Sequence, residues 1–180
     1  MRFEATPLAG AVVVEVDRHA DARGFFGRVF CRDEFVAAGL PAEFVQASVS
    51  YNLKRGTLRG MHFQAAPREE PKLVRCTRGA IHDVIVDLRR DSATHRRWFA
   101  VELSAENRRA LYVPPGFAHG FQTLVDDSEI LYQMAERYAP ELARGVRWND
   151  PAFGIAWPIA DPFMSERDAA YPDYTPGITS

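Results

Sequence analysis

Short runs of β-branched and aromatic residues dominate this chain, and Gly, Pro and Asp residues separate them. Many short strands with turn residues between them are typical of all-β sandwiches and barrels. The pattern predicts an all-β fold of the double-sheet jelly-roll kind. The predicted strands span residues 10–16, 24–30, 46–53, 57–64, 72–79, 80–88, 98–103, 110–117, 119–125 and 129–138.

Helical patterns are few and short. The stretch 32–40 predicts a short helix that ends at Gly39, and 104–109 has a weaker pattern for one helical turn beginning at Ser104. From about residue 150 several prolines break the pattern, and proline cannot donate to a strand ladder. We therefore expect a single domain over 1–180 whose C-terminal arm, from about residue 150, wraps over the sheets.

Composition narrows the class of protein. A chain of 180 residues with 47% hydrophobic and 26% charged residues is an ordinary globular domain. The formal net charge of −2 gives no electrostatic footprint for nucleic acid. The sequence contains no apolar stretch of membrane-spanning length and no signal-peptide pattern. Cys31 and Cys76 have no metal or redox spacing, so we expect reduced thiols in a cytoplasmic protein.

The stretch TLRGMHFQ (57–64) contains the first candidate for chemistry. His62 lies between the large apolar residues Met61 and Phe63, and from this stretch alone a structural histidine is the better interpretation. Arg59 and His62 are three residues apart, so simple alternation would put them on opposite faces of the strand. We expect Gly60 to accommodate a bulge that turns both side chains toward one pocket.

A second histidine follows a sharp turn in PPGFAHGF. The pattern Pro-x-Gly-x-x-His, which ends at His119, matches the second sequence motif of the cupins, a family of small β-barrels. Metal-binding cupins add a His-x-His pair in their first motif, but the matching place here reads His62-Phe63-Gln64. Two histidines without an obvious third ligand make a poor transition-metal site, so we predict no metal.

Other polar residues interrupt neighbouring strands. Lys72 and Tyr132 alone fit a surface lysine and a packed aromatic residue, and Asp83 and Asp87 are unusual in an Ile/Val strand unless they are paired or hydrogen-bonded. Together with His62 they supply a base, an acid, a cation and a carboxylate.

The motifs in combination resemble one family. DARGFF (21–26), LRGMHFQ, PKLVRC, PPGFAHGF and RWNDP (147–151) occur in the order found in the dTDP-4-dehydrorhamnose 3,5-epimerase family of cupin-type nucleotide-sugar epimerases. The resemblance covers nearly the whole chain. It implies a cupin-type jelly roll, usually a homodimer, that uses neither a metal nor an organic cofactor. The implied substrate is a nucleoside diphosphate 4-keto-6-deoxyhexose, epimerised at carbon 3, carbon 5 or both.

The resemblance also implies roles for individual residues. His62 corresponds to the family's base, Asp168 to its carboxylate partner, Tyr132 to the acid and Lys72 to the cation beside the keto oxygen. The positions expected to contact the sugar, diphosphate or nucleotide are Arg23, Arg28, Gln46, Ser48, Arg59, His119 and Arg167.

Three positions depart from the family pattern. Arg28 and Ala143 stand where glutamate is common, and Ser48 stands where asparagine is common. These departures leave the nucleotide base and the number of inverted carbons open. The alternatives are an epimerase of one carbon only, a keto-isomerase of a related nucleotide sugar, and a sugar-binding jelly roll without enzymatic activity.

Overall fold

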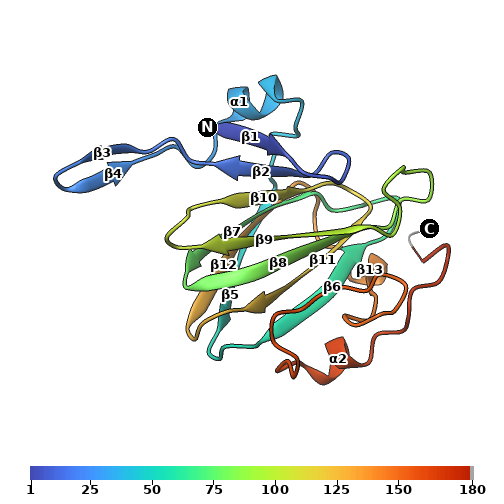
Figure 1. The fold of residues 1–180 in the computed structure, drawn as a ribbon. Coiled ribbons are helices and arrows are strands. Elements are labelled where there is room, and N and C mark those ends of the chain that lie inside the picture. Colours follow the sequence, from blue (N-terminus) through green and yellow to red (C-terminus); the bar gives the residue numbers. More distant parts are fainter. Residues whose placement is uncertain (179–180) are drawn as a thin grey trace.

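The computed structural model describes residues 1–178, which form two facing antiparallel sheets (Figure 1). One sheet has the order β1 (Arg2–Ala5), β2 (Val12–Glu15), β10 (Ala110–Val113), β7 (Lys72–Arg78), β12 (Ser128–Met134) and β5 (Gln46–Asn52). The other has the order β13 (Ala143–Gly145), β6 (Leu58–Gln64), β11 (Phe117–Thr123), β8 (Ala80–Asp87) and β9 (Trp98–Ser104). The predicted all-β, cupin-type jelly roll is confirmed.

The main core lies between the sheets because alternate residues of each strand point inward. On β8, Ile81 and Ile85 face this core, whereas Val84 and Val86 belong to a second apolar cluster on the outer face. That outer cluster includes Phe153, so the C-terminal segment covers the strand. Burial on both faces explains why β8 reads as a nearly continuous apolar run.

The C-terminal arm packs along β6, β8 and β13, with its short helix α2 (Glu166–Ala169) beside the end of β6 (Figure 1). The Trp157 indole donates a hydrogen bond to the Trp148 carbonyl oxygen at 2.9 Å, and Thr57 pairs with Phe163 in an isolated bridge. Within residues 1–178, no helix combines the length and apolar character needed to cross a membrane.

Several element boundaries differ from the predictions. The helix predicted over 32–40 is α1 (Arg32–Ala37), and Gly39 ends it at a φ of 73° while Leu40 N–H bonds to the Phe35 carbonyl. The stretch 104–109 forms the single turn that was predicted: the Arg108 N–H bonds to the Ser104 carbonyl at 3.0 Å, and the side chains of Ser104 and Asn107 each accept the other's amide. The sequence patterns did not reveal β1, β3 (His19–Asp21), β13, α2 or the short 3-10 helix η1 (Pro140–Leu142).

The run 24–30 is only partly a strand. Its first residues form β4 (Gly24–Phe26), which pairs with β3 (His19–Asp21) in a hairpin that projects from the sheets (Figure 1). All six residues of the hairpin strands are exposed, so no core contact extends β4 toward residue 30.

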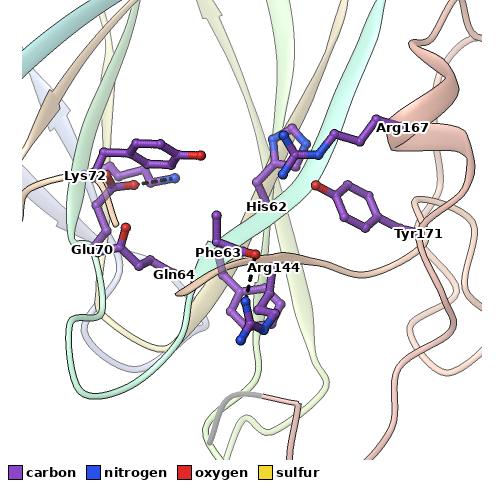
Figure 2. A pocket seen from close by; sticks show the side chains of 10 residues that line it. His62, Phe63, Gln64, Glu70, Lys72, Arg144, Arg167 and Tyr171 are labelled. Carbon is purple, nitrogen blue, oxygen red and sulfur yellow. Dashed lines mark hydrogen bonds and ion pairs between the residues drawn. The ribbon is translucent and has the colours of Figure 1, made fainter. Parts of the chain in front are cut away.

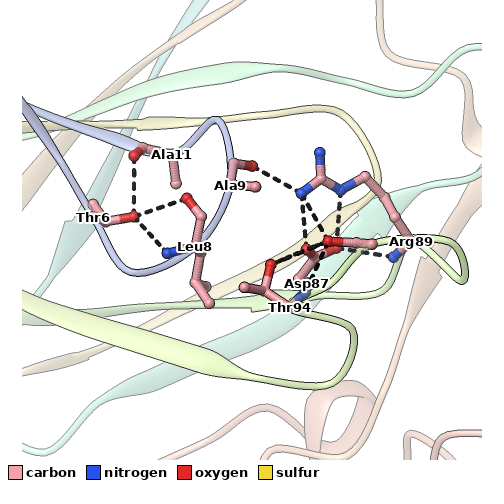
Figure 3. Close-up of polar contacts among 8 residues, drawn as sticks. Thr6, Leu8, Ala9, Ala11, Asp87, Arg89 and Thr94 are labelled. Carbon is pink, nitrogen blue, oxygen red and sulfur yellow. Dashed lines mark hydrogen bonds and ion pairs between the residues drawn. The ribbon is translucent and has the colours of Figure 1, made fainter.

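Asp87 confirms the expectation that the β8 carboxylates are hydrogen-bonded. Its buried carboxylate accepts hydrogen bonds from the side chains of Arg89, Ser92 and Thr94, at 2.6 to 2.9 Å (Figure 3). Arg89 also donates to the Ala9 carbonyl at 2.8 Å. Burial alone would raise the pKa of Asp87, but these donors outweigh it and hold the pKa below its usual value. The charged cluster ties the end of β8 to the N-terminal turn.

Candidate active site

Two adjoining cavities open at one end of the sheets. The larger, here called the sheet cavity, has a volume of about 320 Å³ and lies between the two sheets. The smaller, here called the arm cavity, has a volume of about 230 Å³ and extends toward the C-terminal arm (Figure 2). Both are lined by His62, Glu70 and Lys72. A pocket of this size with a few convergent polar groups is typical of a small-molecule site.

Gly60 sets the direction of the polar side chains on β6. Across the β6–β11 ladder His62 pairs with His119 and Arg59 pairs with Phe121, so β6 carries one extra residue there. Gly60 has a φ of 136°, and an added Cβ would lie 2.6 Å from the Gly120 Cα atom. The predicted bulge is confirmed, and both Arg59 and His62 line the sheet cavity.

His62 is joined to a carboxylate from the arm. Its Nε2 atom lies 2.9 Å from Oδ1 of Asp168, and Oδ2 of Asp168 accepts the Gly60 amide at 3.2 Å. The His62 side chain is 40% exposed and that of Asp168 only 8%, so the imidazole is the accessible member of the pair. Burial alone would raise the pKa of Asp168, but its bond to His62 and the charges of His62 and Arg59 lower it.

A second histidine–carboxylate pair lies deeper between the sheets. Nε2 of His119 is 2.7 Å from Oδ1 of Asp83, and both side chains are buried. The Tyr132 ring packs edge-on against His119 at a centroid distance of 6.0 Å. Burial, reinforced by the charge of Asp83, raises the pKa of Tyr132 well above its ordinary value. Tyr132 therefore stays protonated at neutral pH, as a proton donor must.

Lys72 supplies a positive charge to both cavities. Its Nζ atom lies 3.0 Å from a carboxylate oxygen of Glu70, and both side chains are largely buried. Figure 2 shows Glu70 and Lys72 on one side of the arm cavity and Arg167 and Tyr171 on the other, with His62 between them. An ammonium group held in a partly desolvated cavity can stabilise negative charge that develops on a bound molecule.

Comparison with known proteins identifies the family. The family model described as dTDP-4-dehydrorhamnose 3,5-epimerase matches residues 5–175. The chain belongs to this family. It is thus an isomerase of the racemase and epimerase class.

Named relatives of the epimerase cover nearly the same length. A dTDP-4-dehydrorhamnose 3,5-epimerase of Methanothermobacter thermautotrophicus is 46% identical over 172 residues, which are 93% of this chain and 91% of the relative. The crystal structure of the Bacillus anthracis enzyme, with TDP and PPi bound, has a TM-score of 0.93 and 41% identity, and the match covers 96% of this chain and 99% of that one. A 3'-monoepimerase of Streptomyces bikiniensis, in complex with dTDP-quinovose, has a TM-score of 0.88 and 35% identity over 94% and 86% of the two chains.

The epimerase places most of the predicted site residues around the two cavities. The predicted residues that line the sheet cavity are Ser48, Arg59, His62, Lys72, His119 and Tyr132. Arg167 lines the arm cavity, and Asp168 joins the site through His62. Within residues 1–178, no three His, Cys, Asp or Glu side chains gather in a way that could hold a metal ion.

Three predicted residues of the epimerase lie elsewhere in the single chain. Gln46 accepts the Tyr138 amide at 2.6 Å and lines neither cavity. Arg23 lies at the tip of the exposed hairpin and pairs with Asp21, and Arg28 follows the hairpin and pairs with Glu34. One chain alone therefore does not bring Arg23 and Arg28 to His62.

Sequence reasoning missed Glu70 and Tyr171. Glu70 is two residues before Lys72 at the start of a strand, a spacing that puts two side chains on one face. Tyr171 is three residues after Asp168, just beyond the short helix α2, so one short segment carries both residues. Both spacings were readable from the sequence once Lys72 and Asp168 were singled out.

Proposed function

We propose that the protein epimerises a dTDP-4-keto-6-deoxyhexose, converting dTDP-4-dehydro-6-deoxyglucose to dTDP-4-dehydrorhamnose by inversion at carbons 3 and 5. The observation that carries this proposal is the arrangement of the sheet cavity. Three groups line this cavity: an accessible histidine from β6 that is paired with a carboxylate, a tyrosine from β12 that stays protonated, and a lysine from β7. These are the groups that proton transfer next to a ketone requires.

His62 acts as the base through its Nδ1 atom. Because Nε2 faces the Asp168 carboxylate, the stable neutral tautomer has its proton on Nε2, which leaves the lone pair on Nδ1. Nδ1 removes the proton from the carbon next to the ketone. The electron pair of that C–H bond forms a carbon–carbon double bond, and the carbonyl oxygen becomes an enolate oxygen. The Asp168 carboxylate stabilises the imidazolium ion, and the Lys72 ammonium group stabilises the enolate.

Tyr132 completes the inversion. It donates its phenolic proton to the opposite face of the same carbon, so the ketone re-forms with the configuration reversed. The imidazolium then loses its proton to water and the phenolate regains one, which resets the site. No electrons leave the substrate in this sequence, so the reaction needs no redox partner.

The first prediction concerns the wild-type protein in heavy water. Incubation with dTDP-4-dehydro-6-deoxyglucose should introduce deuterium at carbons 3 and 5, because each inversion returns a solvent-derived proton. Proton NMR of the sugar signals measures this directly, and the cytidine, uridine and guanosine forms test the base preference. Absence of exchange with every nucleotide form would refute the proposal. A product with the carbonyl moved to carbon 3 would identify a keto-isomerase instead.

A second candidate function is epimerisation at carbon 3 alone. The observation that favours it is the likeness to the Streptomyces bikiniensis 3'-monoepimerase, with a TM-score of 0.88. The same experiment separates the two functions, because a monoepimerase leaves the proton on carbon 5 in the product while deuterium appears at carbon 3.

We also infer that the protein works as a homodimer in which the β3–β4 hairpin serves the partner's site. Arg23 and Arg28 occupy positions expected to contact the nucleotide, yet in one chain they lie outside both cavities. The hairpin also exposes Phe25 and Phe26, which are 43% and 75% exposed. A contact with a second copy of the chain explains both the exposed aromatic residues and the arginines that are expected to bind the nucleotide but line neither cavity of their own chain.

Subunit complementation is the second prediction and tests this assembly. Arg23→Ala should weaken nucleotide binding, and His62→Ala should remove the base. If the hairpin reaches the partner, a refolded mixture contains dimers with one site that has both residues, so activity should exceed the sum of the two separate variants. If each hairpin serves its own chain, every site keeps one defect and mixing should restore nothing.

A further inference from the structure

Tyr171 contacts the proposed base from the side of the arm cavity. Its ring meets the His62 ring edge-on, with the centroids 5.7 Å apart and the planes at 71°. Tyr171 lines only the arm cavity, whereas Tyr132 lines only the sheet cavity. Tyr171 is thus the tyrosine whose ring contacts the proposed base, and the mechanism leaves its role unexplained.

The Tyr171 ring packs directly on Gly145. Gly145 is the residue of β13 that pairs with His62 across the β6–β13 ladder, so a group lying on Gly145 is held beside His62. A Cβ atom added to Gly145 would lie 2.5 Å from Cζ of Tyr171 and 2.6 Å from both of its Cε atoms. The ring face therefore lies directly over the Gly145 Cα atom. The φ of Gly145 is not left-handed, so close approach of this ring explains the glycine.

The chain on both sides of Tyr171 is fixed. On one side Asp168 belongs to helix α2, which begins with a hydrogen bond from the Asp168 amide to Oγ of Ser165 at 3.1 Å. On the other side the Pro172 carbonyl accepts the Arg147 amide at 2.9 Å. The guanidinium carbon of Arg167 lies over the Tyr171 ring, 5.9 Å from its centroid. Tyr171 thus has Arg167 and Gly145 as neighbours, and its position is set by the same segment that carries Asp168.

We propose that Tyr171, which packs on Gly145, is a positioning residue for His62. The inference rests on the proposed function, since it assigns a role to the surroundings of the base. An imidazole joined to one carboxylate can still rotate about χ2, a torsion with broad wells. Contact with the Tyr171 ring restricts that rotation and keeps Nε2 on Asp168 and Nδ1 toward the sheet cavity. The phenol hydroxyl is not needed for this role, but the ring is.

Four variants test the proposal. Tyr171→Phe keeps the ring and should retain wild-type kcat. Tyr171→Ala should lower kcat roughly 10- to 100-fold with little change in KM, because loss of orientation affects the chemical step more than binding. Gly145→Ala keeps Tyr171 but displaces its ring, so it should reproduce the same loss. The double variant Gly145→Ala/Tyr171→Ala should be no worse than Tyr171→Ala, because the added methyl group then has no ring to displace.

A spectroscopic measurement separates positioning from simple loss of structure. In protein labelled with ¹⁵N histidine, His62 should show one tautomer in the wild type and in Tyr171→Phe, and averaged signals in Tyr171→Ala and Gly145→Ala. An unchanged dTDP affinity and an unchanged thermal unfolding temperature show that a variant is folded. Tyr171→Leu replaces Tyr171→Ala if the alanine variant fails to fold. Wild-type kcat and a single tautomer in Tyr171→Ala would overturn the proposal. Additive losses in the double variant would also overturn it. If the proposed function is wrong, the wild type also shows no turnover. The His62 signals still test the contact with Tyr171 in that case.

Discussion

His62→Ala should reduce deuterium incorporation from heavy water by roughly 10³- to 10⁴-fold, the upper range for loss of a general base. The imidazole is the accessible member of a pair whose carboxylate is almost fully buried. Removing it leaves Asp168 without a group that can reach the substrate. Because both inversions use the same base in our proposal, exchange at carbon 3 and carbon 5 should fall together. NMR of the substrate protons measures both rates in one experiment.

The matched control is His95→Ala. His95 lies in the loop between β8 and β9, where its Nε2 atom bonds to the Tyr174 hydroxyl at 2.9 Å, and it lines neither cavity. This variant should keep exchange near the wild-type rate, and both variants should bind dTDP with similar affinity. Exchange by His62→Ala within tenfold of wild type, with dTDP binding intact, would show that another group removes the proton.

Asp168→Asn is expected to cause a smaller loss of exchange than His62→Ala, because it keeps a polar partner for His62 but removes the stabilising charge.

Asp168 also shows why the sequence predicts the sheets better than the site. Strands such as β8 and β11 are local patterns of apolar residues, and their burial follows from alternation. The contact between His62 and Asp168 joins residues 106 positions apart, and no local pattern contains it. Only the resemblance to a family connected the two residues.

Gly60 and Gly145 differ in how far their roles could be predicted from the sequence. The bulge at Gly60 was predictable because Arg59 and His62 violate the alternation of a single strand. Gly145 violates no local pattern, since its reason is a ring that arrives from residue 171. In the hairpin, β3 was not predicted and β4 was predicted too long, because their exposed residues make no core contact that would define their ends.

Tyr132→Phe should separate proton removal from inversion. The variant keeps the ring packed beside His119 and leaves the His62–Asp168 pair untouched, but it lacks the phenolic proton. Inversion should slow roughly 100-fold or more, the usual cost of losing a general acid. Exchange through His62 should be reduced much less, because the imidazolium can exchange with solvent and return deuterium to the same face. The starting sugar should therefore gain deuterium faster than the epimer accumulates.

Tyr112→Phe is the control for this substitution, since Tyr112 is also buried but packs in the cluster around Phe35, away from both cavities. It should keep inversion and exchange in the wild-type ratio. An equal loss of both rates in Tyr132→Phe would mean that Tyr132 also takes part in proton removal. Because burial and Asp83 raise the pKa of Tyr132, the acid should remain protonated well above neutral pH. Inversion by the wild type should therefore show no alkaline loss from Tyr132 near pH 8, whereas a phenol with a lowered pKa would produce one.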